Sequence, residues 1–178
     1  MQKFLGLIPA RSGSKRAKGK NVRILAGHPL LAYTIVAAQE SGLFDDIVVS
    51  SDDEKYLEIA KQYGASTPFI RPSALATDVS PDIEWVSHAI DSLAEKGRTF
   101  ENFSILRPTS PFRTASTIVR AWQTFTDHPN ADTLRAVETC AQHPGKMWIE
   151  HSGTIVPLLP FEISGQPWHS NQTANLPP

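Results

Sequence analysis

Short apolar runs alternate along this chain with segments whose apolar residues recur at helical spacing. The first run, residues 4–8, is continuous and is followed by Pro9, as is typical of a strand buried on both faces. Further strand-like runs are predicted at residues 47–49, 67–71, 103–106 and 134–137. Because parallel neighbours need a crossover connection, this order favours an α/β fold.

Four helices are predicted between these strands, three of them over residues 30–41, 54–63 and 114–125. The fourth starts with Ser80 as N-cap and Pro81 as first helical residue, and its apolar stripe is Ile83, Val86, Ile90 and Leu93. Right-handed crossovers place helices on both faces of a sheet. The sequence therefore predicts a doubly wound, mainly parallel sheet with helices on both faces.

The alternation weakens toward the end of the chain. A hairpin is expected from residues 146–150 and 154–158 around Ser152-Gly153, and residues 160–178 resemble loop. A chain of 178 residues is long enough for one core and too short for two full domains. We therefore expect one domain over residues 1–178.

Several classes of protein are disfavoured by what the chain contains. No apolar stretch approaches the roughly 20 residues of a bilayer span, and the first residues lack a secretory pattern, so a cytoplasmic location is expected. Cys140 is the only cysteine, which excludes an intramolecular disulfide and a thiolate zinc site. The six histidines never stand at the spacing of a paired metal site.

Positive charge is concentrated just after the first strand. Residues 11–23 hold six basic side chains and no acidic one, although the formal net charge of the chain is −1. Nucleic-acid binders usually spread positive charge over a face, so this concentration favours a local polyanion site. A solvated or nuclear-localisation run is the alternative. We rank it lower, because the run lies between two predicted elements and contains two glycines.

The loop over residues 11–21, called the basic loop below, suits phosphate groups. Ligands of open α/β sheets bind beyond the carboxyl ends of the strands, and this loop follows the first strand. Gly13 and Gly19 let backbone N–H groups approach phosphate oxygens. Charged donors come from Arg11, Lys15 and Lys20.

Two common phosphate-binding motifs are missing from the basic loop. A Walker A loop has four residues between its glycines and a Ser or Thr after its Lys, whereas five residues separate Gly13 from Gly19 and Asn21 follows Lys20. The dinucleotide fingerprint Gly-x-Gly-x-x-Gly is missing too. A Walker ATPase and a Rossmann dehydrogenase are therefore disfavoured.

A series of short motifs runs through nearly the whole chain: IPARSGSK at 8–15, GKN at 19–21, VVSSD at 48–52, RP at 71–72, LATD at 75–78 and PTSPFR at 108–113. In this order they resemble the acylneuraminate (CMP-sialic acid) cytidylyltransferase family. The related enzymes that activate Kdo share the Pro-Ala-Arg start but usually continue with Ser-x-Arg and Gly-Lys-Pro. Lys15 and Asn21 therefore favour the sialate branch.

This resemblance implies a nucleotidyltransferase-like variant of the Rossmann fold. In the implied reaction, the anomeric 2-hydroxyl of a nonulosonic acid attacks the α-phosphate of CTP, giving a CMP-sugar and pyrophosphate. It also implies catalytic roles for Arg11, Lys15 and Lys20. The nucleotide would be held by Arg11, Ser12, Gly13, Ser14, Lys15, Lys20, Asn21, Arg71 and Ser80, and the sugar by Arg107, Thr109, Ser110 and Lys146.

Some of these side chains have plainer interpretations, and one departs from the family. Arg71 could be a surface arginine, and Lys146 could be solvated. Thr109 and Ser110 could cap the next helix. The family often has Gln where this chain has Arg107, which can still bind an acidic sugar and can alter which sugar is accepted.

The resemblance further implies Mg²⁺ as cofactor, CTP and an acidic nonulosonic sugar as partners, and a homodimer. Family members continue into a dimerising region and an Asp-x-Asp motif that binds the metal, so residues 1–178 are expected to lack the C-terminal part of the domain. No arginine stands shortly before Leu176-Pro177, where the family commonly has one. Asp52 and Asp53 suit either a metal or a helix cap and are assigned to neither.

Three hypotheses follow from the sequence. The first is a cytidylyltransferase, and the second is a nucleotide-binding module whose catalysis is impaired. The third, a nucleic-acid-binding protein, ranks last because no aromatic residue interrupts the basic run. We expect neither a nucleic acid nor a membrane as partner.

Overall fold

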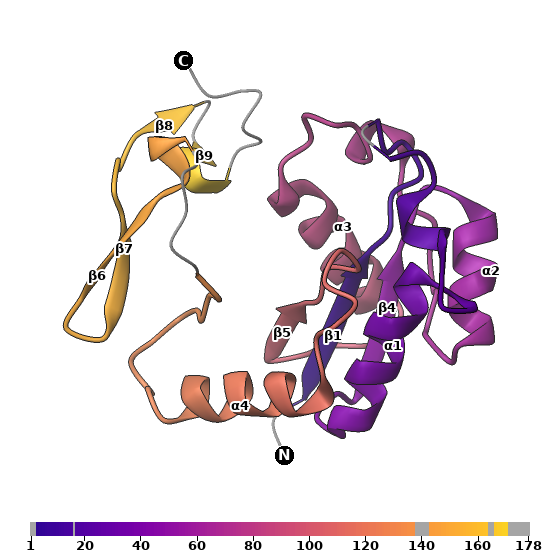
Figure 1. The fold of residues 1–178 in the computed structure, drawn as a ribbon, viewed down its shortest axis with the longest axis horizontal. Helices are drawn as coiled ribbons and strands as arrows, with labels where there is room; N and C mark the ends of the chain where they lie inside the picture. Colours follow the sequence, from indigo (N-terminus) through magenta and orange to yellow (C-terminus); the bar gives the residue numbers. More distant parts are fainter. Residues whose placement is uncertain (1–2, 16, 138–142, 164–165, 171–178) are drawn as a thin grey trace.

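Three parallel strands form the central sheet in the order β4–β1–β5 (Figure 1). The computed structural model describes residues 3–15, 17–137, 143–163 and 166–170. Leu7 lies opposite Val48 on one side and opposite Ile105 on the other, and a single parallel bridge joins Val48 to Ser66. The strands are β1 (Phe4–Pro9), β4 (Asp46–Ser50) and β5 (Asn102–Ile105).

Helices cover both faces of the sheet, which confirms the predicted doubly wound fold (Figure 1). The helices are α1 (Leu30–Ser41), α2 (Glu54–Gln62), α3 (Asp82–Ala94) and α4 (Ala115–Thr126). Ile8 and Val49 belong to a core with α1, α2 and α4, whereas Leu7 and Val48 belong to a core with α3. Neighbouring strand residues reach different cores because side chains alternate across a sheet. Among the described residues, no helix has both the length and the apolar character needed to cross a bilayer.

Local sequence explains several helix ends. Asp53 caps α2 by accepting a hydrogen bond from the Lys55 N–H at 2.8 Å. Thr114 accepts from the Thr117 N–H at the start of α4. Gly42 ends α1 in the left-handed conformation, with φ of 66°. These residue types satisfy backbone groups that a helix leaves unpaired at its ends.

The start and the buried face of α3 differ from the prediction. Ser80 does not cap the helix, because its hydroxyl bonds back into the preceding loop and Pro81 precedes the first turn. Val86 and Leu93 are buried as predicted, whereas Ile83 and Ile90 are exposed. The indole of Trp85 is the largest apolar group on this helix, and its burial selects a different face. That face consists of Trp85, Val86, Ala89 and Leu93.

Two predicted strands do not form in the described part of the chain. Residues 67–71 follow the Ser66 bridge without becoming a strand, since Pro68 has no N–H to donate and Ile70 is exposed. Residues 134–137 are also not a strand, and both ends of this run are exposed. Their apolar pattern was therefore a misleading signal.

The predicted hairpin near the end of the chain is confirmed. It pairs β6 (Trp148–His151) with β7 (Thr154–Pro157), and Ser152 and Gly153 between them both have positive φ, as type I′ turns require. A short pair, β8 (Glu162–Ile163) and β9 (Gln166–Pro167), lies where only loop was expected. The remaining elements are β2 (Ile24–Leu25), β3 (His28–Pro29), η1 (Lys20–Val22), η2 (Ser73–Leu75), η3 (Pro144–Lys146) and η4 (Trp168–Ser170).

Candidate functional site

A pocket opens where the loops after β1 and β5 separate. β1 pairs with β4 on one side and with β5 on the other, so the chain reverses its direction of travel across the sheet at this point. Such a switch point is the usual place for a ligand in an open α/β sheet. The cavity measures about 180 Å³ and is lined by Pro9, Arg11, Lys20, Asn21, Arg71, Leu75, Thr77, Ser80, Asp82, Trp85, Arg107, Pro108 and Thr109.

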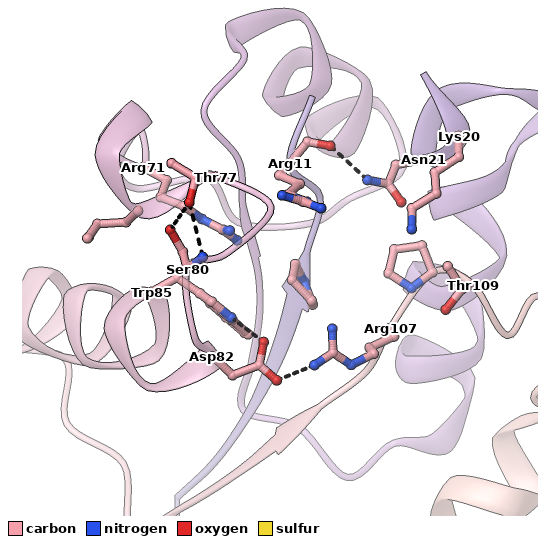
Figure 2. A pocket seen from close by; sticks show the side chains of 13 residues that line it. Arg11, Lys20, Asn21, Arg71, Thr77, Ser80, Asp82, Trp85, Arg107 and Thr109 are labelled. Atoms are coloured by element: carbon pink, nitrogen blue, oxygen red, sulfur yellow. Dashed lines mark hydrogen bonds and ion pairs between the residues drawn. The ribbon is translucent and has the colours of Figure 1, made fainter. Parts of the chain in front are cut away.

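The pocket lining is strongly cationic. Four of its side chains are basic and one is acidic. Figure 2 shows the guanidinium groups of Arg11 and Arg107 and the ammonium group of Lys20 turned toward the same space. Guanidinium and ammonium groups converging on a partly enclosed space suit a ligand with several negative charges.

The basic loop is tied to the neighbouring strand end. Ser12 donates twice to the Asp52 carboxylate, from its N–H at 2.8 Å and from its hydroxyl at 2.7 Å. Asn21 is 3% exposed, and its Nδ2 donates to the Arg11 carbonyl oxygen at 3.0 Å. The peptide group between Arg11 and Ser12 is therefore held at both its carbonyl oxygen and its N–H. The backbone turns into η1 through Gly19, whose φ of 62° is favourable for glycine.

Lys15 points to a different partner from the one expected. Its Nζ lies 2.5 Å from Asp78 Oδ2, and its side chain is 77% exposed. The hydrogen bond from Lys15 is the main cause that lowers the pKa of Asp78. Lys15 is not part of the pocket lining and instead joins the basic loop to the loop before α3.

Arg71 is a buried arginine, so its interpretation as a surface residue is wrong. It is 4% exposed and donates to Ser50 twice, from Nε to the hydroxyl at 3.0 Å and from Nη2 to the carbonyl oxygen at 2.8 Å. Its guanidinium lies over the Trp85 ring, 4.9 Å from the centroid. Burial lowers the pKa of Arg71 to about 10, although Asp52 and Asp82 oppose that shift. The group therefore stays charged at neutral pH.

Asp82 and Trp85 belong to the pocket but were missed by sequence reasoning. The Trp85 Nε1–H donates to Asp82 Oδ1 at 2.9 Å, and Arg107 Nη2 contacts Asp82 Oδ2 (Figure 2). The second contact joins α3 to the loop after β5, 25 residues further along the chain. The sequence does contain one signal that could have identified them, a tryptophan in the first turn of the helix that follows the LATD motif.

The structure gathers about half of the predicted site residues around one pocket. Those in the lining are Arg11, Lys20, Asn21, Arg71, Ser80, Arg107 and Thr109. The others are Ser12, Gly13, Ser14, Lys15, Ser110 and Lys146. Thr114 rather than Thr109 or Ser110 caps α4, so the capping interpretation of those two residues is wrong. The roles assigned to all these residues remain predictions.

Lys146 lies outside the lining but within electrostatic reach of the pocket. It ends η3, and burial is the first cause that lowers its pKa, followed by the positive charge of Arg135. Asp82 opposes this shift and Arg107 adds to it. Lys146 is therefore a partly buried lysine rather than a fully solvated one.

The carboxylates near the pocket bear on the expected divalent cation. Within the described residues, no three His, Cys, Asp or Glu side chains come together as ligands. Asp52 accepts from Ser12, Asp53 caps α2, and Asp82 is held by Trp85 and Arg107. Each of these carboxylates thus has a partner within the protein, and Mg²⁺ usually needs only one or two carboxylates beside the phosphates of its substrate.

Comparisons with known proteins match this arrangement. A family model described as Cytidylyltransferase matches residues 5–145. The chain is 47% identical over 119 residues to CMP-N,N'-diacetyllegionaminic acid synthase of Legionella pneumophila, covering 67% of this chain and 51% of that protein. It is 44% identical over 119 residues to N-acylneuraminate cytidylyltransferase of Escherichia coli, covering 67% of this chain and 27% of that protein.

A solved structure shares the fold. CMP:2-keto-3-deoxy-manno-octonic acid synthetase complexed with CTP superposes with a TM-score of 0.58 at 17% identity, covering 71% of this chain and 48% of that one. At this identity the likeness concerns the fold alone. The chain spans about half the length of the legionaminic acid synthase and about a quarter of the E. coli protein.

Proposed function

We propose, since this chain belongs to the cytidylyltransferase family, that it transfers CMP from CTP to the anomeric 2-hydroxyl of a sialic-acid-like nonulosonic acid and releases pyrophosphate. One observation carries the proposal. Four cationic side chains from the loops after β1 and β5, η1 and the segment before α3 line one pocket at the switch point of the sheet. Similarity to enzymes named for CMP-activated sugars supports the choice of substrates.

The chemical step is an in-line displacement at the α-phosphorus of CTP. The sugar oxygen forms a bond to this phosphorus, the bond to the bridging oxygen of the β-phosphate breaks, and the hydroxyl proton is released. Negative charge grows on the departing pyrophosphate. Arg11 and Lys20 face the pocket and would stabilise that charge, while the Asn21 contact keeps Arg11 aligned without reorganisation.

Nucleoside recognition is assigned to the other end of the pocket. The hydroxyls of Thr77 and Ser80 lie 2.7 Å apart in the lining, which offers a donor and an acceptor to ribose or cytosine. Arg71 and Trp85 form a rigid, polar wall beside them. The sugar is assigned to Arg107 and Thr109, with Lys146 close enough to add positive charge.

A divalent cation remains a prediction. Mg²⁺ would neutralise phosphate charge when bound with CTP. Among the described residues no three His, Cys, Asp or Glu side chains cluster as ligands, so the phosphates of CTP would supply part of its coordination. Its effect is measured by adding and chelating Mg²⁺ during CTP titration.

The test is incubation of the 178-residue chain with CTP, Mg²⁺ and N-acetylneuraminate, legionaminate or pseudaminate, with release of pyrophosphate as readout. Pyrophosphate that depends on both CTP and sugar supports the proposal. CTP binding without pyrophosphate supports the impaired nucleotide-binding module instead. Equal binding of any polyanion, with a steep salt dependence and no preference for CTP, supports the nucleic-acid hypothesis.

Two further parts of the proposal concern the cell and the assembly. We place the reaction in the cytoplasm, where CTP is available, and we propose a homodimer. Light scattering after size exclusion measures the mass directly. A monomer of 19.6 kDa at all concentrations would contradict the dimer for these residues.

A further inference from the structure

Among the described residues that line the pocket, Asp82 is the single carboxylate beside Arg11, Lys20, Arg71 and Arg107. CTP and an acidic sugar are both anionic, so a carboxylate in the wall repels each of them at short range. Its presence in a cationic pocket therefore needs a physical reason. The contacts of its two oxygens supply one.

The two oxygens of Asp82 have different partners (Figure 2). Oδ1 accepts from the indole N–H of Trp85 at 2.9 Å, and that ring is itself buried under the Arg71 guanidinium. Asp82 is also the first residue of α3, where the helix dipole favours a negative charge. Asp82 is thus held in place by contacts that do not involve Arg107.

Arg107 is held more loosely on the other side of this contact. It contacts Asp82 Oδ2 through Nη2, and its side chain is 51% exposed against 36% for Asp82. Ion pairs with this much exposure contribute little to stability. Arg107 can therefore leave Asp82 at low cost when a second carboxylate becomes available, and Asp82 keeps its indole hydrogen bond.

We propose that Asp82 is an internal counter-ion that positions Arg107 and is exchanged for the carboxylate of the incoming sugar. This inference rests on the proposed function. In the exchange one ion pair is lost and one is formed, so Arg107 is never left uncompensated. An acceptor without a carboxylate leaves the Arg107–Asp82 pair in place, so Asp82 competes only with acidic sugars and sets how tightly they bind.

The test measures binding of N-acetylneuraminate and of its uncharged methyl ester to the full chain by calorimetry, with CDP present because it lacks the pyrophosphate leaving group. The variant is Asp82→Asn, whose side-chain oxygen can still accept from Trp85. Without the competing carboxylate, we expect the dissociation constant of the acid to fall about two- to tenfold while that of the ester stays within about twofold. Glu84→Gln, an exposed carboxylate in the same helical turn, should change neither.

A double-mutant cycle with Arg107→Gln localises the effect. Because the exchange needs the guanidinium, Asp82→Asn should no longer improve acid binding once Arg107 is replaced. If Asp82→Asn binds both acid and ester more weakly, Asp82 is a direct sugar ligand and the exchange is overturned. Unchanged binding of both compounds would also overturn the exchange. Binding of the sugar and of CTP to the wild-type chain is measured first. If neither binds, the proposed function itself fails, whatever the variants show.

Discussion

The two sides of the pocket hold their cations in different ways. On the strand-end side, Arg71 is buried and donates to Ser50, and the Arg11 carbonyl oxygen is fixed by Asn21. On the side between α3 and β5, Arg107 is half exposed and contacts a single carboxylate. The difference indicates that the side proposed for the nucleotide is preorganised, whereas the side proposed for the sugar can adjust. Preorganised donors avoid an ordering cost on binding, and adjustable ones allow exchange between anions.

The largest expected effect is on the preorganised side. Arg71→Ala removes two hydrogen bonds to Ser50 and uncovers the Trp85 ring. The free energy of unfolding should fall by about 3 kcal/mol, or roughly 10 °C in Tm, as measured by thermal denaturation. Arg107→Ala is the matched arginine control and should cost no more than about 1 kcal/mol. Equal losses of unfolding free energy in Arg71→Ala and Arg107→Ala would contradict the difference between the two sides of the pocket.

The next effect concerns CTP affinity. Arg11→Ala and Lys20→Ala each remove a charged donor that faces the pocket, so the dissociation constant for CTP should rise about 10- to 100-fold by calorimetry. Lys18→Ala removes an exposed charge of the same loop outside the lining and should change it less than about threefold. Unchanged affinity in Arg11→Ala would contradict the phosphate role of the basic loop.

A smaller effect on CTP affinity is expected from a residue that shapes the basic loop without lining the pocket. Asp52→Ala removes both acceptors of Ser12 but no residue of the pocket lining. The loop then has more conformations to lose on binding, and the dissociation constant for CTP should rise about three- to tenfold. Asp53→Asn keeps an oxygen that can cap α2 and should leave CTP binding unchanged. An unchanged affinity in Asp52→Ala would show that this tether does not matter for binding.

The smallest effect is expected at the exposed Lys15–Asp78 pair. Lys15 lowers the pKa of Asp78, so the pair contributes at neutral pH and its contribution is lost as the pH falls through that lowered pKa. Asp78→Asn should therefore change Tm by no more than about 2 °C at pH 7, and the difference from wild type should disappear in acid. A difference that grows as the pH falls would have the wrong sign for this ion pair.

Most of the fold could be predicted because its signals are local. The strands at residues 4–8, 47–49 and 103–106 and the helix at residues 30–41 are confirmed within a few residues. The failure at residues 67–71 has a local cause, since Pro68 interrupts the ladder. Periodicity also misjudged α3, because the burial of Trp85 depends on a partner from another segment.

The site was only partly predictable for a related reason. Charge density identified the basic loop, but it could not show that Lys15 pairs with Asp78 rather than facing the pocket. The contact between Asp82 and Arg107 spans 25 residues of sequence, and no short motif contains both. Pairings of this kind depend on the sheet order, which places the start of α3 beside the end of β5.

The double hydrogen bond from Ser12 to Asp52 has a consequence for protein engineering. The shape of the basic loop depends partly on Asp52, which follows the adjacent strand, rather than wholly on its own residues. Grafting residues 11–21 alone onto another α/β scaffold would transfer the positive charge without the Asp52 carboxylate that holds Ser12 in place. A functional transplant must carry the carboxylate that follows β4 as well.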